Sequence, residues 1–162
     1  MYDRPVLATK NPPGEKLIAS NKRAFHEYHV LDKFEAGIEL LGTEVKSLRD
    51  GQANLKDSYV TFKNGEAFLF GAHISPYTHG NRENHDPIRT RKLLLHRREI
   101  EKLHVQVMEK GLSVVPLRLY FKGGRVKAEL GVVRGKKLFD KRETEKKREA
   151  DREAAVAMKE RR

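Results

Sequence analysis

The chain has 162 residues, no cysteine, and 34 Lys+Arg against 23 Asp+Glu, which gives a formal net charge of +11 at pH 7. The absence of cysteine excludes disulfide bonds, cysteine-ligated zinc and thiol catalysis, and the positive charge favours a nucleic acid or an acidic membrane face as partner. No apolar run approaches the roughly 18 residues that span a bilayer, and the start lacks the apolar stretch of a secretory signal, so we expect a cytoplasmic protein that binds nucleic acid.

In chain order, the first predicted elements are a loop, a strand and a short helix. Residues 1–19 read as a flexible loop, because their prolines break any regular element. Apolar residues then alternate imperfectly over residues 26–41, which predicts one long curved strand with a bulge or bend at Gly37. Thr43 stands before residues 44–49 in the position of a helix N-cap.

Two hairpins follow. Residues 59–70 turn at Asn64-Gly65, a pair that tolerates the positive φ angles of a two-residue turn. Residues 114–133 turn at Gly123-Gly124. In this second hairpin, the alternation assigns the inward face to Leu117, Leu119, Phe121, Val126, Ala128, Leu130 and Val132.

A helix is predicted between the hairpins. Ile100, Leu103 and Val107 recur at helical spacing, with a possible cap at His96 and a possible stop at Gly111. Short strands, tight hairpins and one helix predict a mainly β protein, with a small closed barrel of the oligonucleotide-binding type (OB-like) and short flanking helices. We expect its body to span residues 20–133.

Residues 134–162 read as a basic tail. It opens with RGKKLFDKR at 134–142, five basic residues and one acid around a single aromatic. The tail has too few large apolar residues to fold alone, so we expect it to be disordered when free and helical on a partner. Its cations would neutralise phosphates, and Phe139 could stack on a base. The alternative is a solvated end.

Further candidates for contact with RNA lie in the body. Asn21, Lys22, Arg23, His26 and Tyr28 combine donors, cations and rings, a mixture suited to RNA with partly unstacked bases. The other cationic candidates are Lys46 and Arg49 on the short helix, and Arg89, Arg91 and Lys92 before an apolar run. Solvation of exposed charges is the alternative, and Tyr28 also suits a core position.

The histidines raise an alternative from another class, a metal-dependent nuclease using His85 and Asp86. The clustered residues are His73, His79, His85, Asp86 and His96. Their spacing matches no defined ligand array, and a loop histidine beside aspartate more often makes a local hydrogen bond. We therefore predict no metal, no cofactor and no catalysis.

Specific runs of residues carry a resemblance to a known family. In chain order they are NKR at 21–23, HEY at 26–28, FEAGI at 34–38, GTEVKSLR at 42–49, DSY at 57–59, HISPY at 73–77, NHDP at 84–87, RTRKLLL at 89–95, GKK at 135–137 and DKR at 140–142. From Ile18 to the end, the chain resembles the SsrA-binding proteins, also called small protein B.

The resemblance implies a bacterial ribosome-rescue factor and not an enzyme. Such a factor binds the transfer-RNA-like domain of tmRNA (SsrA RNA), joins a delivery complex with elongation factor Tu, and places its tail in the empty messenger channel near the decoding centre of a stalled ribosome. A structural ribosomal RNA-binding protein remains an alternative.

The resemblance also implies roles for particular residues. It assigns RNA binding to Asn21, Tyr28 and Glu35; a carboxylate at position 35 would accept hydrogen bonds from base or ribose donors, or orient a neighbouring cation. It assigns ribosome contacts to the tail residues Arg134, Lys136, Lys137, Phe139, Asp140, Lys141 and Arg142. Phe139 replaces a His or Tyr often found there, which keeps stacking but removes a polar ring.

Overall fold

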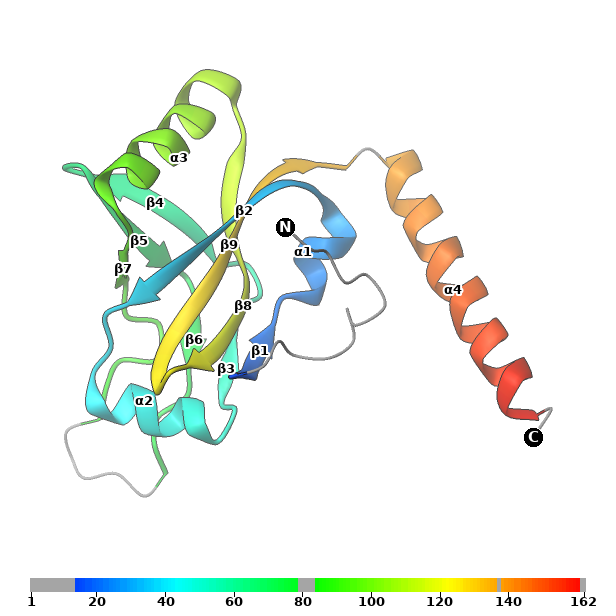
Figure 1. Ribbon diagram of the computed structural model, residues 1–162, viewed down its shortest axis with the longest axis horizontal. Coiled ribbons are helices and arrows are strands. Elements are labelled where there is room, and N and C mark those ends of the chain that lie inside the picture. The colour runs from blue at the N-terminus through cyan, green and yellow to red at the C-terminus, as the bar shows by residue number, and fades with distance from the viewer. Residues whose placement is uncertain (1–13, 79–83, 137, 161–162) are drawn as a thin grey trace.

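The computed structural model describes residues 14–78, 84–136 and 138–160 of the chain. Seven strands form one antiparallel sheet in the order β1-β8-β9-β2-β7-β5-β4 (Figure 1). These strands are β1 (Glu15–Ser20), β2 (Tyr28–Ile38), β4 (Tyr59–Lys63), β5 (Glu66–Phe70), β7 (Arg91–Leu94), β8 (Ser113–Lys122) and β9 (Arg125–Gly135). A separate pair joins β3 (Ala53–Asn54) to β6 (His73–Ile74).

Four helices accompany the strands in the described part of the chain. They are α1 (Lys22–Glu27), α2 (Gly42–Arg49), α3 (Arg97–Lys110) and α4 (Leu138–Glu160). Figure 1 shows α2 and α3 at opposite ends of the curled sheet, α1 beside β8, and α4 projecting away from the body. The body therefore combines a mainly β core with short flanking helices, as predicted.

Both predicted hairpins are confirmed, and local turn chemistry explains them. Asn64 and Gly65 have φ angles of 52° and 74°, and Gly123 and Gly124 have φ angles of 58° and 75°. Positive φ at both central residues matches the right-handed twist of the strands that the turn joins. β4 therefore pairs directly with β5, and β8 with β9.

The helix between the hairpins is also confirmed. Glu99 accepts a hydrogen bond at 3.1 Å from the backbone N–H of His96, and Gly111 ends the helix in the left-handed region with φ of 64°. Leu103 on its inner side is completely buried. The helix thus seals one end of the core.

The beginning of the body differs from the prediction. Residues 15–20, expected to be loop, form β1 because they pair with β8; residues 1–13 lie outside the described part of the chain. Residues 22–27 form α1, so the long strand begins at Tyr28 and not at 26. A short helix of this kind carries little apolar periodicity, and its cap depends on contacts distant in the sequence.

Two further local predictions are corrected. Leu41, not Thr43, precedes α2, and its N–H donates to Glu44 Oε1 at 2.7 Å. The irregularity in β2 lies between Val30 and Asp32, not at Gly37. Gly37 instead permits a close approach, because a Cβ at this position would lie 3.2 Å from Leu94 Cβ.

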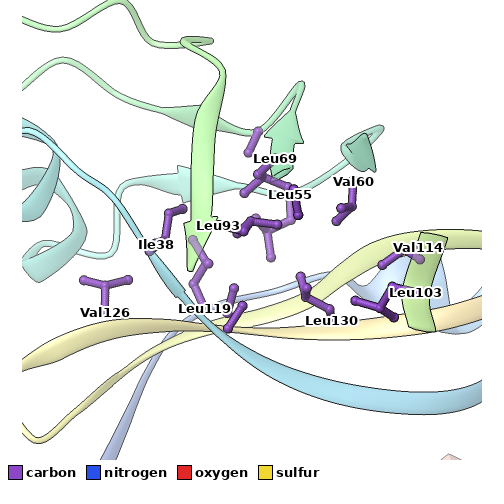
Figure 2. Close-up of a cluster of buried hydrophobic side chains, with 14 of the residues drawn as sticks. Ile38, Leu55, Val60, Leu69, Leu93, Leu103, Val114, Leu119, Val126 and Leu130 are labelled. Carbon is purple, nitrogen blue, oxygen red and sulfur yellow. The ribbon is translucent and has the colours of Figure 1, made fainter. Parts of the chain in front are cut away.

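The main core lies between the curled halves of the sheet. Figure 2 shows its aliphatic side chains converging from β2, β5, β7, α3, β8 and β9. Among the residues drawn, Leu69, Leu93, Leu103, Leu119 and Leu130 are each at most 1% exposed. The alternating positions predicted to face inward on β9 are confirmed as buried.

A second cluster lies on the opposite face of β8 and β9, beneath α1. Its buried members are Ala24, Val115, Leu117 and Val133. A register shift between Pro116 and Arg118 moves Leu117 onto this face, so the prediction that Leu117 points inward with Leu119 is wrong. An extra residue in a strand reverses the side-chain alternation beyond it.

The sheet does not show the closed barrel that we expected. β4 lies alongside β8, but within the described residues no ladder of hydrogen bonds joins the two strands. Side chains from β4 and β8 line a cavity of about 540 Å³, together with Val107 and Leu112. Contacts between side chains of β4 and β8 thus take the place of the backbone hydrogen bonds that would close a barrel here.

The tail is helical over Leu138–Glu160, so its expected disorder in the free protein is not confirmed. Its start is joined to α1: the N–H of Lys136 donates to Glu27 O at 2.8 Å, and Lys136 Nζ donates to Phe25 O at 3.1 Å. Further along, Glu145 Oε1 lies 2.7 Å from His26 Nε2. These contacts fix where α4 leaves the body.

A buried ion cluster joins α2 to β7. Glu44 has no exposed side-chain surface and lies 2.6 Å from the guanidinium of Arg89 and 2.6 Å from that of Arg91. Arg91 is also fully buried and donates to Ala72 O at 2.7 Å and Pro87 O at 3.1 Å. Burial acts to raise the pKa of Glu44, but hydrogen bonds from Arg89, the Leu41 N–H and Arg91 hold it below its ordinary value.

Replacing Glu44 with alanine should lower the free energy of unfolding by about 3–5 kcal/mol, because Arg91 would stay buried without its counter-charge. The measurement is urea unfolding followed by circular dichroism. Because the folded pKa of Glu44 is depressed, its contribution should be present above the unfolded pKa and lost as pH falls through the lower folded pKa. The control is Glu66→Ala, which removes a half-exposed pair with Lys92 and should cost under about 1 kcal/mol. Equal losses in both variants would contradict the assignment.

Gly131→Ala should destabilise the protein by about 1–3 kcal/mol through overpacking of the second cluster. A Cβ at this position would lie 2.8 Å from Leu117 Cδ1, and this leucine is completely buried. Gly135→Ala on the same strand is the matched control, because nothing lies within 4 Å of its added Cβ. Thermal unfolding of both variants tests the prediction, which a native-like melting temperature for Gly131→Ala would refute.

Candidate nucleic-acid interface

The face of β1, β8, β9 and β2 that points away from the main core forms one continuous surface, which we call the outer face. Cross-strand pairing sets Glu35 of β2 beside Glu129 of β9, and Glu129 beside Arg118 of β8. Tyr120 of β8 pairs with Lys127 of β9 in the same way. The second cluster and α1 cover one end of this face, and mainly polar side chains cover the rest, with the exposed Leu17 of β1 beside Tyr120.

At the α1 end, the structure separates a positioning residue from exposed cations. Asn21 is only 6% exposed; its Nδ2 donates to Pro116 O at 2.9 Å and Leu55 O at 3.3 Å, and its Oδ1 accepts from the Ala24 N–H. Its amide is therefore committed to holding α1 on β8, so the direct RNA contact predicted for Asn21 is not available in this structure. The cation of Lys22 is exposed.

The other predicted residues of α1 and the start of β2 are partly engaged. Arg23 pairs with Glu27 at 2.9 Å and with Asp57 at 3.4 Å, yet stays 46% exposed. Tyr28 is half-buried and packs against the second cluster. The residue also lines the cavity between β4 and β8, so it has both core contacts and exposed surface.

Glu35 lies at the other end of the outer face, in a network that the sequence did not identify. Tyr120 donates its hydroxyl to Glu35 Oε2 at 2.5 Å, and Lys122 Nζ lies 3.2 Å from the same oxygen. The Arg118 guanidinium stands 4.4 Å from the centre of the Tyr120 ring. The hydrogen bond from Tyr120 is the main cause that holds the pKa of Glu35 below its ordinary value, and it outweighs burial.

The network extends across three strands. Arg118 is held by Glu15 of β1 and Glu129 of β9, each at 3.2 Å. Burial, followed by the hydrogen bond to Glu35, raises the pKa of Tyr120, so its hydroxyl stays protonated and donates. The alternation that places Leu119 and Phe121 inward also places Arg118, Tyr120 and Lys122 outward, and this was the signal available in the sequence.

The remaining basic candidates divide into exposed and buried residues. Lys46 and Arg49 are exposed on α2, and Lys46 Nζ lies 5.7 Å from the centre of the Tyr77 ring. Arg91 is buried and Arg89 is bonded to Glu44, so the prediction that the whole basic run faces RNA is wrong for Arg91. Its physical reason is the ion cluster with Glu44, which lies far away in the sequence.

Lys92 is the member of that run that reaches the outer face. It pairs with Glu66 at 3.2 Å and lines a shallow cavity of about 820 Å³, which Glu35 and Lys127 also line. The structure therefore places Lys92 beside Glu35, whereas Tyr28 lies at the opposite end of the outer face, next to α1. Lys46 and Arg49 lie at the α2 end of the molecule (Figure 1).

The predicted tail residues follow directly after β9. Arg134 is exposed and pairs in the ladder with His29, and Arg142 is exposed on α4. Phe139, Asp140 and Lys141 lie in the first turn of α4. Lys137 lies outside the described residues.

His85, which the nuclease alternative would use, instead makes hydrogen bonds that stabilise the fold. His85 is only 6% exposed; its Nδ1 lies 2.9 Å from Thr43 Oγ1, and its Nε2 lies 2.8 Å from Ile74 O. Both ring nitrogens therefore join α2 to β6. Among the described residues, no group of histidine, aspartate and glutamate side chains has an arrangement that could hold a metal ion. His79 lies outside this set.

One observation bears on the membrane alternative. None of the helices in the described ranges is both long and apolar enough to cross a membrane. The longest, α4, carries charged residues along its length.

Comparisons with known proteins identify one family over most of the chain. The family model described as SmpB protein matches residues 18–160. The SsrA-binding protein of Geobacter sulfurreducens is 62% identical over 147 residues, which are 91% of this chain and 96% of that protein. The SsrA-binding protein of Syntrophobacter fumaroxidans is 56% identical over 158 residues, covering 95% of this chain and 98% of the relative.

A solved structure is similar as well. A chain from the work called "tmRNA-SmpB: a journey to the center of the bacterial ribosome" has 48% sequence identity and a TM-score of 0.64. The match covers 74% of this chain and 85% of that chain. With the family match over residues 18–160, these similarities establish that the chain belongs to the SmpB protein family, which is not a family of enzymes.

Proposed function

We propose that the chain binds the transfer-RNA-like domain of tmRNA, also called SsrA RNA, and brings it to stalled bacterial ribosomes. The observation that carries this proposal is the 62% identity with an SsrA-binding protein over 96% of that relative's length. The similar solved chain, which comes from work on tmRNA-SmpB and the bacterial ribosome, supports the same partners. Ribosomes work in the cytoplasm, where we place the protein.

The outer face is the surface that we assign to tmRNA. Exposed cations on α1, β8 and β9 can neutralise phosphates, and the half-buried Tyr28 offers a ring edge next to them. A transfer-RNA-like fold presents unstacked loop bases beside closely spaced phosphates, which need both kinds of contact. The fixed carboxylate of Glu35 adds an acceptor for base or ribose donors.

The tail is the part that we assign to the ribosome. Residue 142 and residues 145–156 of α4 are exposed, and the basic residues among them include Arg142, Lys146, Lys147, Arg148 and Arg152. A helix of this kind matches the phosphates that line an empty messenger channel, with residues 134–142 at its entrance near the decoding centre. Elongation factor Tu is the carrier that we expect in the delivery complex, because the RNA partner is transfer-RNA-like. We also propose that the tail, a helix over Leu138–Glu160, is helical on the ribosome.

Replacing Lys22, Lys122 and Lys127 together with alanine should weaken tmRNA binding and flatten its salt dependence. Each lost phosphate contact reduces the slope of log affinity against log salt by about 0.7–0.9. The measurement is a binding titration at several salt concentrations. A control triple of Lys63, Arg98 and Lys110, exposed cations away from the outer face, should keep the wild-type slope. Equal slopes for the two triples would show that the outer face is not the interface.

Removing residues 138–162 should spare tmRNA binding and abolish tagging of proteins on stalled ribosomes. The cut leaves Arg134 and Gly135, which pair with β2, and Lys136, which bonds to α1. Tagging is measured in a translation assay on a message without a stop codon. The variant with Lys22, Lys122 and Lys127 replaced is the reciprocal control, since it should lose affinity for tmRNA while its tail is intact. Normal tagging by the truncated chain would contradict the role assigned to α4.

A further inference from the structure

The two edges of the seven-stranded sheet are protected to different degrees. β1 and β4 are its edge strands. β1 carries Glu15 and Lys16, and charged residues on an edge strand discourage a further strand from pairing with it. β4 reads YVTF before its first charged residue, Lys63, and it contains no proline. β4 therefore has the composition of an edge that accepts another strand.

The backbone of β4 has polar groups that its pairing with β5 does not use. The two-residue turn makes Lys63 and Glu66 the first hydrogen-bonded pair of the hairpin, and bonded and non-bonded pairs alternate from there. The backbone of Thr61 is then bonded to β5. The N–H and C=O groups of Val60 and Phe62 point the other way, to the open edge.

The beginning of β8 presents a second open edge opposite β4. β1 pairs only with residues 118–122 of β8, so residues 113–115 have a paired strand, β9, on one side only. Pro116 O accepts from Asn21 Nδ2, so it points away from β9, and Val114, two residues earlier, has the same orientation. Val114 is 1% exposed. Its N–H and C=O are thus buried polar groups outside the β8–β9 ladder, and such groups usually have partners.

The gap between β4 and the beginning of β8, which we call the seam, contains the cavity of about 540 Å³. Among the described residues that line it, none is Lys or Arg, and Asp57 is the one charged side chain. Asp57 is 71% exposed and lies 3.4 Å from Arg23, whose closer partner is Glu27 at 2.9 Å. On a chain with a net charge of +11, such a lining disfavours phosphate and favours a neutral or basic ligand.

We propose that the seam accepts an extended, neutral or basic segment of a partner protein as an additional strand between β4 and β8. The open N–H and C=O groups of Val60, Phe62 and Val114 match only a ligand that alternates donors and acceptors along its length, as a polypeptide backbone does. Alternate side chains of the segment enter the cavity. The seam is a different surface from the outer face, and the inference does not depend on RNA as a ligand.

The seam can open without loss of backbone hydrogen bonds. A strand between two others holds them about 9–10 Å apart, twice the ordinary spacing. β4 and β8 lie closer than that in part of the seam, so the β4–β5 hairpin has to move outward. Only side-chain contacts oppose this movement, because no ladder joins β4 to β8 in the described part of the chain.

The outer side of the hairpin offers a further contact. The rings of Tyr59 and Phe70 lie 5.3 Å apart between their centres, and each residue is almost half exposed. They stand on the face of β4 and β5 that points away from the core, whereas the buried Val60 points inward. Outward side chains of an inserted strand can therefore pack beside Tyr59 while the inward ones fill the cavity.

The test uses the full chain and a blocked peptide of about seven residues, with alternating valine and threonine between terminal lysines. Amide hydrogen exchange is followed by NMR with and without saturating peptide. The amides of Val60, Phe62 and Val114 should exchange at least about 10-fold more slowly when the peptide is bound. The amide of Thr61, already bonded to β5, should be unchanged and is the internal control. Absence of added protection at these three amides overturns the proposal.

A second peptide tests whether backbone pairing holds the segment. It has the same sequence, with the backbone nitrogens of alternate residues methylated, so one edge can no longer donate. It should bind at least about 10-fold more weakly. Equal affinity of the two peptides overturns the proposal, because binding would then need only side chains. This comparison requires no variant to fold.

Variants assign the binding to the seam. Val60→Pro removes an open N–H of β4 and should lose the peptide, whereas Val60→Ala keeps that N–H and should bind it more tightly than Val60→Pro does. Asp57→Asn keeps the shape at a position whose φ of 62° asparagine tolerates. It should weaken binding of the lysine-ended peptide about 2- to 5-fold and leave a serine-ended peptide unaffected. Identical binding by Val60→Pro and Val60→Ala contradicts the proposal.

A parallel titration distinguishes a polypeptide from RNA at the seam. Oligouridine that protects the three amides in place of the peptide overturns the inference. The transfer-RNA-like domain of tmRNA should bind wild type and Val60→Ala equally, since the seam lies apart from the outer face. Failure of the wild-type chain to bind that domain contradicts the proposed function and leaves the seam result standing.

Discussion

Burial of β8 on both of its faces is the constraint on which the rest of the structure depends. Leu119 packs into the main core, while Val115 and Leu117 pack outward beneath α1. Alternation along the strand already places Val114 in the main core and Val115 in the second cluster, and the register shift at residues 116–118 then reverses that alternation for the residues that follow. Val115 and Leu117 form the apolar surface on which α1 packs. After the shift, Arg118, Tyr120 and Lys122 lie on the open part of the same face, where Glu35 lies.

The predictable parts of the fold are those determined by neighbours in the sequence. The glycine turns of both hairpins and the cap and stop of α3 act over a few residues, so their patterns were sufficient. α1 depends on Asn21, whose amide bonds to carbonyls 34 and 95 residues away. No local pattern contains that information, and the helix was therefore missed. The open seam between β4 and β8 was missed for the same reason, because local alternation does not reveal whether the last strands of a sheet meet.

The sequence predicted the type of site, a basic surface for RNA, but not which residues would lie on that surface. Basic residues next to an apolar run indicated RNA contact, yet Arg91 is drawn into the body by Glu44, which lies 47 residues earlier in the sequence. A buried carboxylate between two guanidinium groups cannot be recognised from either run alone. Tyr28 was a candidate from its residue type as well as from the resemblance, Glu35 from the resemblance alone, and the structure adds the residues that hold Glu35. Which residues are exposed on the outer face is thus determined by partners distant in the sequence more than by the local density of charge.

The short connection between β9 and α4 has a mechanical consequence. The ladder of β9 continues to Gly135, the Lys136 N–H is bonded to α1, and the helix begins at Leu138. A helix of 23 residues is about 34 Å long at about 1.5 Å per residue. Its length makes it a lever arm whose pivot lies next to α1, at one end of the outer face. A tilt of about 10° at the pivot displaces the far end by about 6 Å, roughly one helical turn, so small rearrangements of α1 become large excursions of the tip.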